Sequence, residues 1–496
     1  IDDVALAPVT YPCPCAITAS GANGCQGQSA THTLTVSCST AETVDLALAG
    51  NVWDATISPT TVDVPAGGTA EVTVTVDVPF NAALMDNDAL TVSATPQSMP
   101  DALTASTVRT GFLGVDGEWT AMAPLPAGRV FAAEAVTDEY IFVIGGTSDA
   151  AGDTEVATNY RYTIATDTWE EMTGLPVAAS QISAVALDGK IYIPGASPAG
   201  VWDSNTYVYD ITTDAWTTIP TSGTFIGAVF YGVTVDAATG TIYRLGGIID
   251  DGAGGLIGTN RVWALDVASS TWTELPTMQA ARMNASVSFI NGQVYAAGGV
   301  AFPGFASVPS TEIFDGTTWT YGAPVPTGGT LNGWTYGAYA TAWNSMYMFG
   351  GKRDTAWAVL NHTGMYVPAN DIWMTTPALP VITLGRVYLG GGSNSTALWA
   401  TGGRDSAGAT IYDVHERLNL CVAAAAGVAV TPEIDAALGE AGTDVTYALT
   451  LENTGNLADE IDLVVASVWP TAVDPAGPYT LEAYSSVDVT VTVSIQ

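Results

Sequence analysis

The sequence predicts an all-β chain, with a six-bladed β-propeller in the middle and a β-sandwich at each end. Apolar and polar residues alternate with the period of two that is typical of strands, and no long segment has the 3.6-residue apolar period of a helix. Turn residues are abundant, with 52 Gly and 26 Pro among 496 residues. A short motif also recurs six times in the middle of the chain. We therefore expect a propeller over 114–420, between sandwiches over 1–113 and 421–496.

The central repeat combines a pair of small residues with a tryptophan. A hydrophobic strand ends in two small residues about every 50 positions, at Gly145-Gly146, Gly195-Ala196, Gly246-Gly247, Gly298-Gly299, Gly350-Gly351 and Gly402-Gly403. A tryptophan alternates with these pairs, at Trp119, Trp169, Trp216, Trp272, Trp319 and Trp373. Between the two lies a strand rich in aromatic residues.

This pattern resembles the kelch repeat, which implies a six-bladed kelch β-propeller with four strands in each blade. The glycines would let neighbouring sheets approach, and the tryptophan would fill the wedge between blades. Trp119 has no blade strands before it, and the last unit, about 386–416, has no tryptophan strand after it. We therefore expect residues 117–122 to complete the sixth blade and close the ring.

The two ends of the chain are copies of one pattern. Residues 33–36, 44–48, Trp53, 57–59 and 72–76 align with residues 448–451, 461–465, Trp469, 473–475 and 489–493. Both copies resemble immunoglobulin-like β-sandwiches, and residues 452–459 resemble a hairpin of bacterial and archaeal surface-protein modules of the NEW3/CARDB type. The N-terminal copy continues into a further strand at 89–94, whereas the C-terminal copy lacks this last strand within the sequence.

Charge and composition exclude several partners. The net charge is -37 because only 12 Lys and Arg residues oppose 49 Asp and Glu. No basic patch is available for nucleic acid or an anionic membrane. The longest apolar run, near 421–430, is too short to span a bilayer. A surface of Thr, Ser, Asn and Gly is typical of an extracellular protein, either secreted or on the cell surface.

The five cysteines also favour an oxidising compartment. We expect Cys13, Cys15, Cys25 and Cys38 to form two disulfides, with all three connectivities open. Zinc is a less favoured alternative because the four do not form two close pairs. Cys421 is then left over, either buried and free or paired between chains.

No catalytic constellation is evident. The three histidines, His32, His362 and His415, are expected to be surface or strand residues, and the blades contain no cysteine for a copper centre of the galactose-oxidase type. Arg129, Arg282 and Arg386 precede the inner strands of blades 1, 4 and 6. They either converge on an anionic ligand, as in sialidase-like propellers, or hydrogen-bond the carbonyls of loops between blades.

The loops after the second strand of each blade are the best candidates for binding. They carry aromatic residues that we expect on one face, Trp202, Phe302, Phe305 and Trp357, near His362. Such residues suit sugar stacking or a protein partner, and ordinary loop packing is the alternative. The candidate calcium ligands are Asp149, Asp153 and Glu155, or Asp250 and Asp251, although neither group matches a known calcium motif. Glycosylation triplets begin at Asn284, Asn361 and Asn394.

These features predict a non-catalytic extracellular structural or adhesive protein, a subunit of a cell-surface or filamentous assembly joined through its terminal sandwiches. One alternative is an accessory carbohydrate- or protein-binding region of a larger secreted hydrolase. Another is a propeller enzyme of the sialidase or galactose-oxidase type. The predicted partner is a second copy, whose strand from Asp3 to Val9 would add to the open edge of the C-terminal sandwich. The equally favoured alternative is that residue 496 is not the natural end of the chain and that the edge is not open.

Overall fold

The computed structural model describes residues 15–19, 22–79, 82–149, 154–220, 225–326, 335–352, 359–375, 379–421, 428–431, 440–453, 459–461, 463–465, 467–481 and 486–496. The chain forms two compact units, one of residues 114–420 and one of residues 1–113 with 421–496. Strands dominate both units, and among the described residues the one helical segment is a single 3₁₀ turn, η1 (Pro198–Gly200). No helix in this described part of the chain has the length and apolar character needed to cross a membrane.

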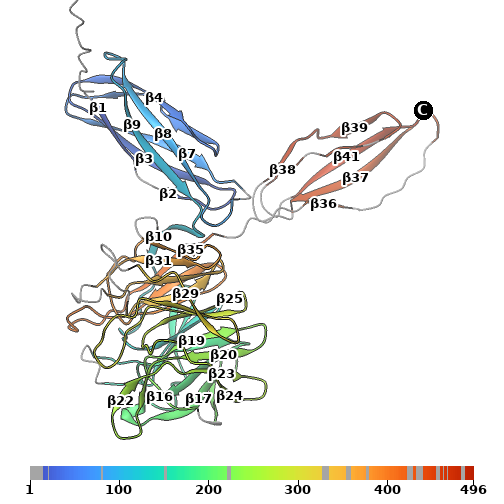
Figure 1. The fold of residues 1–496 in the computed structure, drawn as a ribbon. Coiled ribbons are helices and arrows are strands. Elements are labelled where there is room, and N and C mark those ends of the chain that lie inside the picture. The colour runs from blue at the N-terminus through green and yellow to red at the C-terminus, as the bar shows by residue number, and fades with distance from the viewer. Residues whose placement is uncertain are drawn as a thin grey trace, which may run out of the picture. The chain divides into compact units, whose positions relative to one another are not determined.

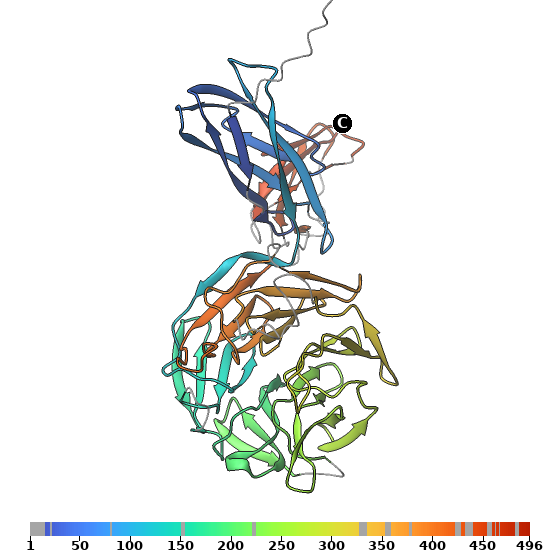
Figure 2. The same ribbon diagram turned by 60° about the vertical axis from the view of Figure 1, so that its left-hand side comes forward.

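Residues 114–420 fold into six antiparallel four-stranded sheets arranged as a ring, which Figure 2 shows. Each sheet is one blade, and its strands are named from the inner edge to the outer edge. Blade 1 contains β11 (Ala133–Val136), β12 (Tyr140–Ile144), β13 (Asn159–Thr163) and β14 (Thr168–Met172). Blade 2 contains β15 (Val185–Leu187), β16 (Lys190–Ala196), β17 (Asp203–Asp210) and β18 (Ala215–Ile219). Blade 3 contains β19 (Gly232–Asp236), β20 (Thr241–Leu245), β23 (Val262–Asp266) and β24 (Thr271–Leu275).

The remaining three blades follow the same plan. Blade 4 contains β25 (Ser286–Ile290), β26 (Gln293–Ala297), β27 (Thr311–Phe314) and β28 (Trp319–Gly322). Blade 5 contains β29 (Ala338–Ala342), β30 (Ser345–Phe349), β31 (Thr363–Val367) and β32 (Ile372–Thr375). Blade 6 contains β33 (Gly390–Ser393), β34 (Ala397–Thr401), β35 (His415–Leu420) and β10 (Val115–Ala121). A small hairpin, β21 (Ile248–Asp250) and β22 (Leu256–Gly258), extends a loop of blade 3.

The predicted closure of the ring is confirmed. β10 is the outermost strand of blade 6, where Val115 pairs with Leu420 and Ala121 with Glu416. In Figure 2 this cyan strand lies beside the orange strands from the other end of the propeller. The first and last parts of the propeller sequence therefore share one sheet, which leaves neither as an exposed edge.

The double glycines join neighbouring blades through the main chain. The second residue of the pair donates its N–H to a carbonyl in the loop that precedes the next blade. Gly146, for example, donates to the Ala179 carbonyl at 2.8 Å. Gly403 makes the same 2.8 Å bond to Arg129 across the closure. Gly402 has φ +62°, and a Cβ placed there would lie 2.6 Å from the Arg129 carbonyl oxygen. This position therefore requires glycine for conformation and for space.

Replacing Gly402 with alanine is expected to destabilise the propeller by about 2–4 kcal/mol, since the left-handed conformation and the backbone clash add together. Gly240 is the matched control, because it has φ +68° and a Cβ added there would have no neighbouring atom within 4 Å. Gly240→Ala should cost only about 1 kcal/mol. Chemical denaturation followed by tryptophan fluorescence measures both, and equal losses would show that the close approach between blades contributes nothing.

The repeated tryptophans tie each outer strand to the preceding blade. The indole N–H of Trp169 donates to the Ala123 carbonyl at 2.8 Å, and that of Trp216 to the Thr173 carbonyl at 2.9 Å. The aspartates just before them add a second link. Asp167 accepts bonds from the Ala123 N–H and the Tyr162 hydroxyl, and Asp214 and Asp371 repeat this arrangement. The sequence motif of aspartate and tryptophan is thus an inter-blade clamp.

We call described residues 15–113 the N-terminal module. Its first sheet contains β1 (Cys15–Ala19), β3 (Ser29–Cys38), β7 (Thr69–Asp77) and β5 (Ala55–Ser58), in that order. Its second sheet contains β2 (Ala22–Asn23), β9 (Thr104–Gly111), β8 (Asn87–Pro96), β4 (Glu42–Ala49) and β6 (Thr61–Val64). Alternate residues of these strands are buried, among them Leu34, Val72, Val74, Leu90 and Val92, so both sheets contribute one face to a common core.

We call described residues 428–496 the C-terminal module (Figure 1). Its larger sheet contains β36 (Val428–Thr431), β37 (Asp444–Asn453), β41 (Ser486–Ser494) and β39 (Thr471–Asp474), and a separate pair is formed by β38 (Asp459–Ile461) and β40 (Tyr479–Leu481). Its core includes Leu451, Ile461, Tyr479, Leu481 and Val489. The immunoglobulin-like character of either module stays a prediction.

The disulfides correct one expectation. Cys15 pairs with Cys38, but Cys25 pairs with Cys421 and not with a cysteine near it in sequence. Gly24 bonds the Gly111 carbonyl at the end of β9, just before the chain enters the propeller, and Cys421 directly follows the last strand of the propeller. Ring closure thus brings entry and exit together, which sequence spacing cannot reveal. The expectation that Cys421 is left over is wrong. Cys13 and the predicted donor strand from Asp3 to Val9 lie outside the described residues.

Candidate binding face of the propeller

One mouth of the propeller axis is formed by six equivalent residues, one from each blade. Each lies two to four residues before the inner strand of its blade and has a left-handed φ between 51° and 61°. We call these residues the mouth ring: Phe131, Gln181, Phe230, Asn284, Tyr336 and Tyr388. A φ of this sign is uncommon for bulky residues and costs about 1–3 kcal/mol at each position, so the surrounding structure must enforce it.

Backbone hydrogen bonds between neighbouring members of the mouth ring hold this conformation at four of the six junctions between blades. Gln181 donates its N–H to the Phe131 carbonyl at 2.8 Å, Phe230 to Gln181 at 2.8 Å, and Asn284 to Phe230 at 2.8 Å. Tyr388 donates likewise to Tyr336 at 2.9 Å. At these four junctions consecutive blades are bonded to one another beside the axis, which fixes the backbone of the ring around the opening.

Aromatic contacts join the four aromatic members of the mouth ring. The ring centroids of Phe131 and Tyr388 lie 4.3 Å apart, those of Tyr336 and Tyr388 4.8 Å apart, and those of Phe131 and Phe230 5.7 Å apart. Two of the chain's 12 basic residues lie against it. Lys352 Nζ is 4.7 Å from the Tyr336 ring centroid and Arg404 Cζ is 5.2 Å from that of Tyr388.

An axial cavity of about 270 Å³ opens at this mouth and continues between the inner strands. All six blades line it, and polar groups in its wall are mostly bonded to one another, as Ser393 is to the Thr341 carbonyl at 2.6 Å. Asn284 is an exception, since its side-chain nitrogen is buried and has no hydrogen-bond partner. The mouth thus combines apolar rings with one unmatched amide donor.

Three of the aromatic residues predicted to share a face, Trp202, Phe302 and Phe305, lie near the same mouth. Trp202 and Phe302 pack against the buried cluster that includes Tyr336 of the mouth ring, as Phe230 and Tyr388 also do. Phe305 stacks edge-on to Phe302 at 5.5 Å and remains 56% exposed. Trp357 lies outside the described residues. His362 lies beside Asn361, with Nδ1 and Oδ1 3.2 Å apart.

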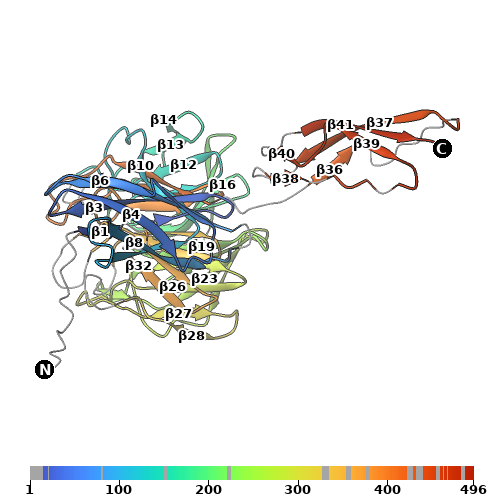
Figure 3. The ribbon, with the colours of Figure 1, turned by 90° about the horizontal axis from the view of Figure 1, so that it is seen from above.

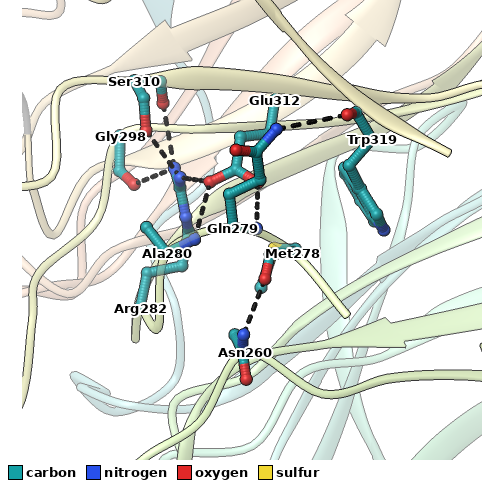
Figure 4. A network of polar contacts seen from close by, with 9 residues as sticks. All are labelled: Asn260, Met278, Gln279, Ala280, Arg282, Gly298, Ser310, Glu312 and Trp319. Atoms are coloured by element: carbon teal, nitrogen blue, oxygen red, sulfur yellow. Dashed lines mark hydrogen bonds and ion pairs between the residues drawn. The ribbon is translucent and has the colours of Figure 1, made fainter. Parts of the chain in front are cut away.

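Arg282 belongs to a closed polar network in blade 4 (Figure 4). Its guanidinium donates to the carbonyls of Gly298 and Ser310 at 3.0 and 2.9 Å and forms an ion pair with Glu312. Glu312 also accepts the N–H groups of Gln279 and Ala280, at 2.6 and 3.1 Å. Both charged side chains are fully buried, and burial lowers the pKa of Arg282 while Glu312 opposes that shift.

The other two arginines have equivalent structural roles. Arg386 forms a fully buried ion pair with Glu416 and donates to the carbonyls of Leu384 and Ala400. Arg129 donates to the Gly128 carbonyl at 2.8 Å and to the Thr158 and Tyr160 hydroxyls at 2.9 and 3.2 Å. The arginines therefore bind loop carbonyls and buried acceptors within their own blades, and their guanidinium groups do not meet at an open site.

Two unusual titratable groups lie at the interface of blades 6 and 1. Burial raises the pKa of Glu134 to about 8, although the Thr401 hydroxyl and the Arg386 charge partly oppose this. Burial lowers the pKa of His415 to about 3. His415 Nδ1 is 3.0 Å from the Thr401 hydroxyl, and its ring stacks on Trp399. Glu134 is buried and also lines the axial cavity, and His415 is buried among aromatic rings, so we assign both to the interface that closes the ring.

The remaining candidates have local roles. Asp149 accepts the Thr154 N–H, and Asp250 and Asp251 accept N–H groups of the hairpin turn that follows them. Glu155 accepts the Ser180 hydroxyl and the Ala199 N–H, and Asp153 lies outside the described residues. Within the described ranges, no three His, Cys, Asp or Glu side chains are placed to hold a metal ion.

The three glycosylation triplets differ in accessibility. The side-chain nitrogen of Asn284, to which a glycan would be attached, is buried in the axial mouth. This triplet is therefore not accessible in the folded propeller. Asn394 accepts the Thr396 and Ala397 N–H groups in a surface turn, and Asn361 is half-buried beside His362.

Sequence reasoning missed the mouth ring because its members share no residue type. The available signal was positional, since each member lies at a constant distance before the first glycine of its blade in five of the six blades. Glu134 gave no signal either. It is a lone acidic residue in an apolar strand, and its burial depends on Gly390 of blade 6, where a Cβ would lie 2.2 Å from the Glu134 carboxyl.

Comparison with known proteins shows that the repeats are similar to kelch repeats. A family model described as the KLHDC2/KLHL20/DRC7 Kelch-repeats domain matches residues 115–299. Kelch-like protein terF of Aspergillus terreus is 29% identical over 320 residues, which cover 58% of this chain and 66% of that protein. Kelch-like protein 40 of Xenopus tropicalis is 27% identical over 188 residues, which cover 38% of this chain and 29% of that protein.

The chain thus spans just under two thirds of the fungal relative and less than a third of the frog one. A solved structure titled "Structure of YjhT" aligns with 60% of this chain and 96% of its own, at 14% identity and a TM-score of 0.49. Residues 115–299 carry a kelch-repeat domain, and the blades built from these repeats belong to an all-β propeller.

Proposed function

We propose that this protein is a non-catalytic extracellular structural or adhesive protein that binds a partner at the aromatic mouth of its propeller. The observation that carries the proposal is the mouth ring, a rigid and mostly aromatic surface with Phe305 exposed beside it. Kelch repeats are general protein-interaction domains, and rigid aromatic surfaces offer binding energy at little cost in conformational entropy.

Several observations support a binding role over a catalytic one. The arginines that could have held an anionic substrate are used within the blades, and Glu312 and Glu416 are their ion-pair partners. His415 is buried among aromatic rings. The mouth ring and the two basic residues beside it present aromatic rings, two amides and two cations, which suit recognition of a surface or a chain end.

Two disulfides support the extracellular location, because such bonds persist in oxidising compartments. Cys25–Cys421 encloses the whole propeller, with a sequence separation of 396 residues. A covalent link between the segments before and after the propeller suits a protein exposed to proteases and mechanical load. We infer that the terminal modules join subunits of a cell-surface or filamentous assembly, while the propeller presents its mouth to a partner.

The test compares Phe305→Ser with Tyr321→Ser in the full chain. Phe305 and Tyr321 have nearly the same exposure, 56% and 58%, but Tyr321 lies on the outer strand β28 and away from the mouth. The immobilised protein is presented to whole cells and to polysaccharide- or protein-coated beads under flow. Phe305→Ser should lower retention at least tenfold, and Tyr321→Ser should leave it unchanged. Equal retention of all three proteins would disprove a role for this face.

A further inference from the structure

Among the described residues that line the axial cavity, two have buried polar atoms without a hydrogen-bond partner. They are Glu134, through both carboxyl oxygens, and Asn284, through its side-chain nitrogen. Glu134 as a whole is 8% exposed. An unpaired buried polar group costs stability, and a group that can ionise costs more. Two such groups in the wall of one cavity therefore mark a place where a ligand can supply the missing partners.

The neighbours of Glu134 leave its carboxyl unpaired. It lies against Gly390 of β33, which has no side chain to bond it. The Thr401 hydroxyl is near enough to oppose the rise in the pKa of Glu134, but this hydroxyl is bonded to His415 Nδ1 at 3.0 Å. Arg386 acts on Glu134 by its charge, while its guanidinium is engaged in the buried ion pair described above. Neither group therefore gives the carboxyl a hydrogen bond.

Glu134 and Asn284 belong to opposite walls of the cavity. Glu134 is on β11 of blade 1, and Asn284 precedes β25 of blade 4, three blades further round the ring of six. Figure 3 shows this relation, with β12–β14 on one side of the propeller and β26–β28 on the other. Asn284 is a member of the mouth ring, whereas Glu134 lies three residues beyond Phe131, the member from its own blade. A ligand that enters through the mouth therefore meets the Asn284 amide first and the Glu134 carboxyl below it.

The two unpaired groups favour a neutral ligand that is rich in hydroxyl groups. Asn284 Nδ2 needs an acceptor, whereas the Glu134 carboxyl accepts hydrogen bonds and also donates one when it holds a proton. A hydroxyl group meets either requirement. A cationic ligand would have to pass Lys352 and Arg404 beside the mouth ring, and an anionic ligand would approach a chain with a net charge of -37.

The size of the cavity and the character of its mouth suit a single sugar ring. A volume of about 270 Å³ is at the small end of ligand sites, which span roughly 300–1,000 Å³. Four of the six members of the mouth ring are aromatic. An aromatic face packs well against the apolar C–H face of a pyranose, while the hydroxyl groups at the edge of the sugar remain available for hydrogen bonds.

We propose that the axial cavity binds a neutral sugar residue, with Asn284 donating to one of its oxygens and Glu134 bonded to its hydroxyl groups. This inference rests on the proposed function, because it names the chemical class that the mouth of the propeller recognises. A terminal sugar of a glycan enters past the mouth ring, while the rest of the glycan stays outside. The unpaired burial of Glu134 lowers the stability of the empty protein, and the ligand relieves it.

The first experiment titrates the full chain with methyl glucoside, methyl galactoside and methyl mannoside in a calorimeter, and at least one of them should bind. Glu134→Leu should weaken that binding at least tenfold, because a side chain of similar size replaces every hydrogen bond of the carboxyl. Glu134→Gln should retain most of the affinity, since an amide also accepts and donates. Glu170→Leu makes the same exchange at a half-exposed site on the outer strand β14 and should leave binding unchanged.

The second experiment separates a binding role from a structural one. Glu134→Leu removes an unpaired buried carboxyl, so its urea midpoint without ligand should rise while its affinity falls. Asn284→Asp removes the N–H donors but keeps a residue type that tolerates φ +51°, and it should weaken binding at least threefold. If both variants lose stability together with affinity, the two residues serve the fold alone and the site is overturned.

Charged analogues test the ligand class. The uronic-acid and amino-sugar forms of the bound glycoside should bind at least fivefold more weakly, and tighter binding of either would overturn the neutral assignment. If no neutral glycoside binds, while retention on cells and beads still depends on Phe305, the sugar site is overturned and the proposed function stands. If binding depends on Glu134, but Phe305→Ser leaves retention unchanged, the cavity site stands and adhesion at the mouth is overturned.

Discussion

Replacing Arg386 with methionine is expected to lower the free energy of unfolding of the propeller by about 3–5 kcal/mol, because it leaves a buried carboxylate without its partner. Glu416 and the Arg386 guanidinium are both fully buried and form an ion pair in the blade that closes the ring. After the change, Glu416 retains only the Thr383 N–H at 2.8 Å among its described bonds. Urea denaturation followed by tryptophan fluorescence measures the loss.

Arg129 provides the matched control, since it occupies the equivalent place in blade 1 and has neutral partners. Arg129→Met should cost about 1–2 kcal/mol, the range for lost neutral hydrogen bonds. The double variant Arg386→Met/Glu416→Gln should recover more than half of the loss of the single one, because it removes the uncompensated charge. If the two arginine variants lose equal stability, the ion pair is not the reason for the effect.

The propeller could be predicted from sequence because its determinants repeat. Each blade must satisfy the same inter-blade contacts, so the glycine pair, the aspartate and the tryptophan recur at one spacing. Closure followed from counting strands, since Trp119 had no blade before it and the last blade had no outer strand after it. The structure places Arg282 and Arg386 just before the inner strands of blades 4 and 6, as expected, but the sequence analysis did not identify their glutamate partners, although each lies 30 residues after its arginine.

The features that escaped prediction depend on three-dimensional proximity. Cys25 and Cys421 pair only because ring closure brings the two ends of the propeller together. The mouth ring is defined by backbone conformation, which Phe, Gln, Asn and Tyr can all adopt when neighbouring blades hold it. Glu134 is buried because blade 6 has glycine opposite it, and no local pattern in either strand marks that match.

The interface between blades 6 and 1, which closes the ring, should make the free energy of unfolding fall at both alkaline and acidic pH. Glu134 has its pKa raised from 4.5 to about 8 in the folded state, so the folded protein holds this proton where the unfolded chain releases it. Its contribution is fully present below pH 4.5 and is lost as the pH rises to about 8, at about 1.4 kcal/mol per pH unit. His415 has its pKa lowered from 6.5 to about 3. Its contribution is present above pH 6.5 and is lost as the pH falls towards 3.

Glu134→Gln should therefore remove the loss of stability at alkaline pH. Relative to the natural protein, the variant should gain stability on the order of 4 kcal/mol at pH 9 and almost none at pH 4.5. His415→Gln should reduce the loss of stability at acidic pH and leave the loss at alkaline pH unchanged. Because other carboxylates titrate in both proteins, the measured quantity is the difference between variant and natural protein at each pH, from urea denaturation at pH 4 to 9. A difference that does not vary with pH would show that Glu134 is already ionised inside the closed ring.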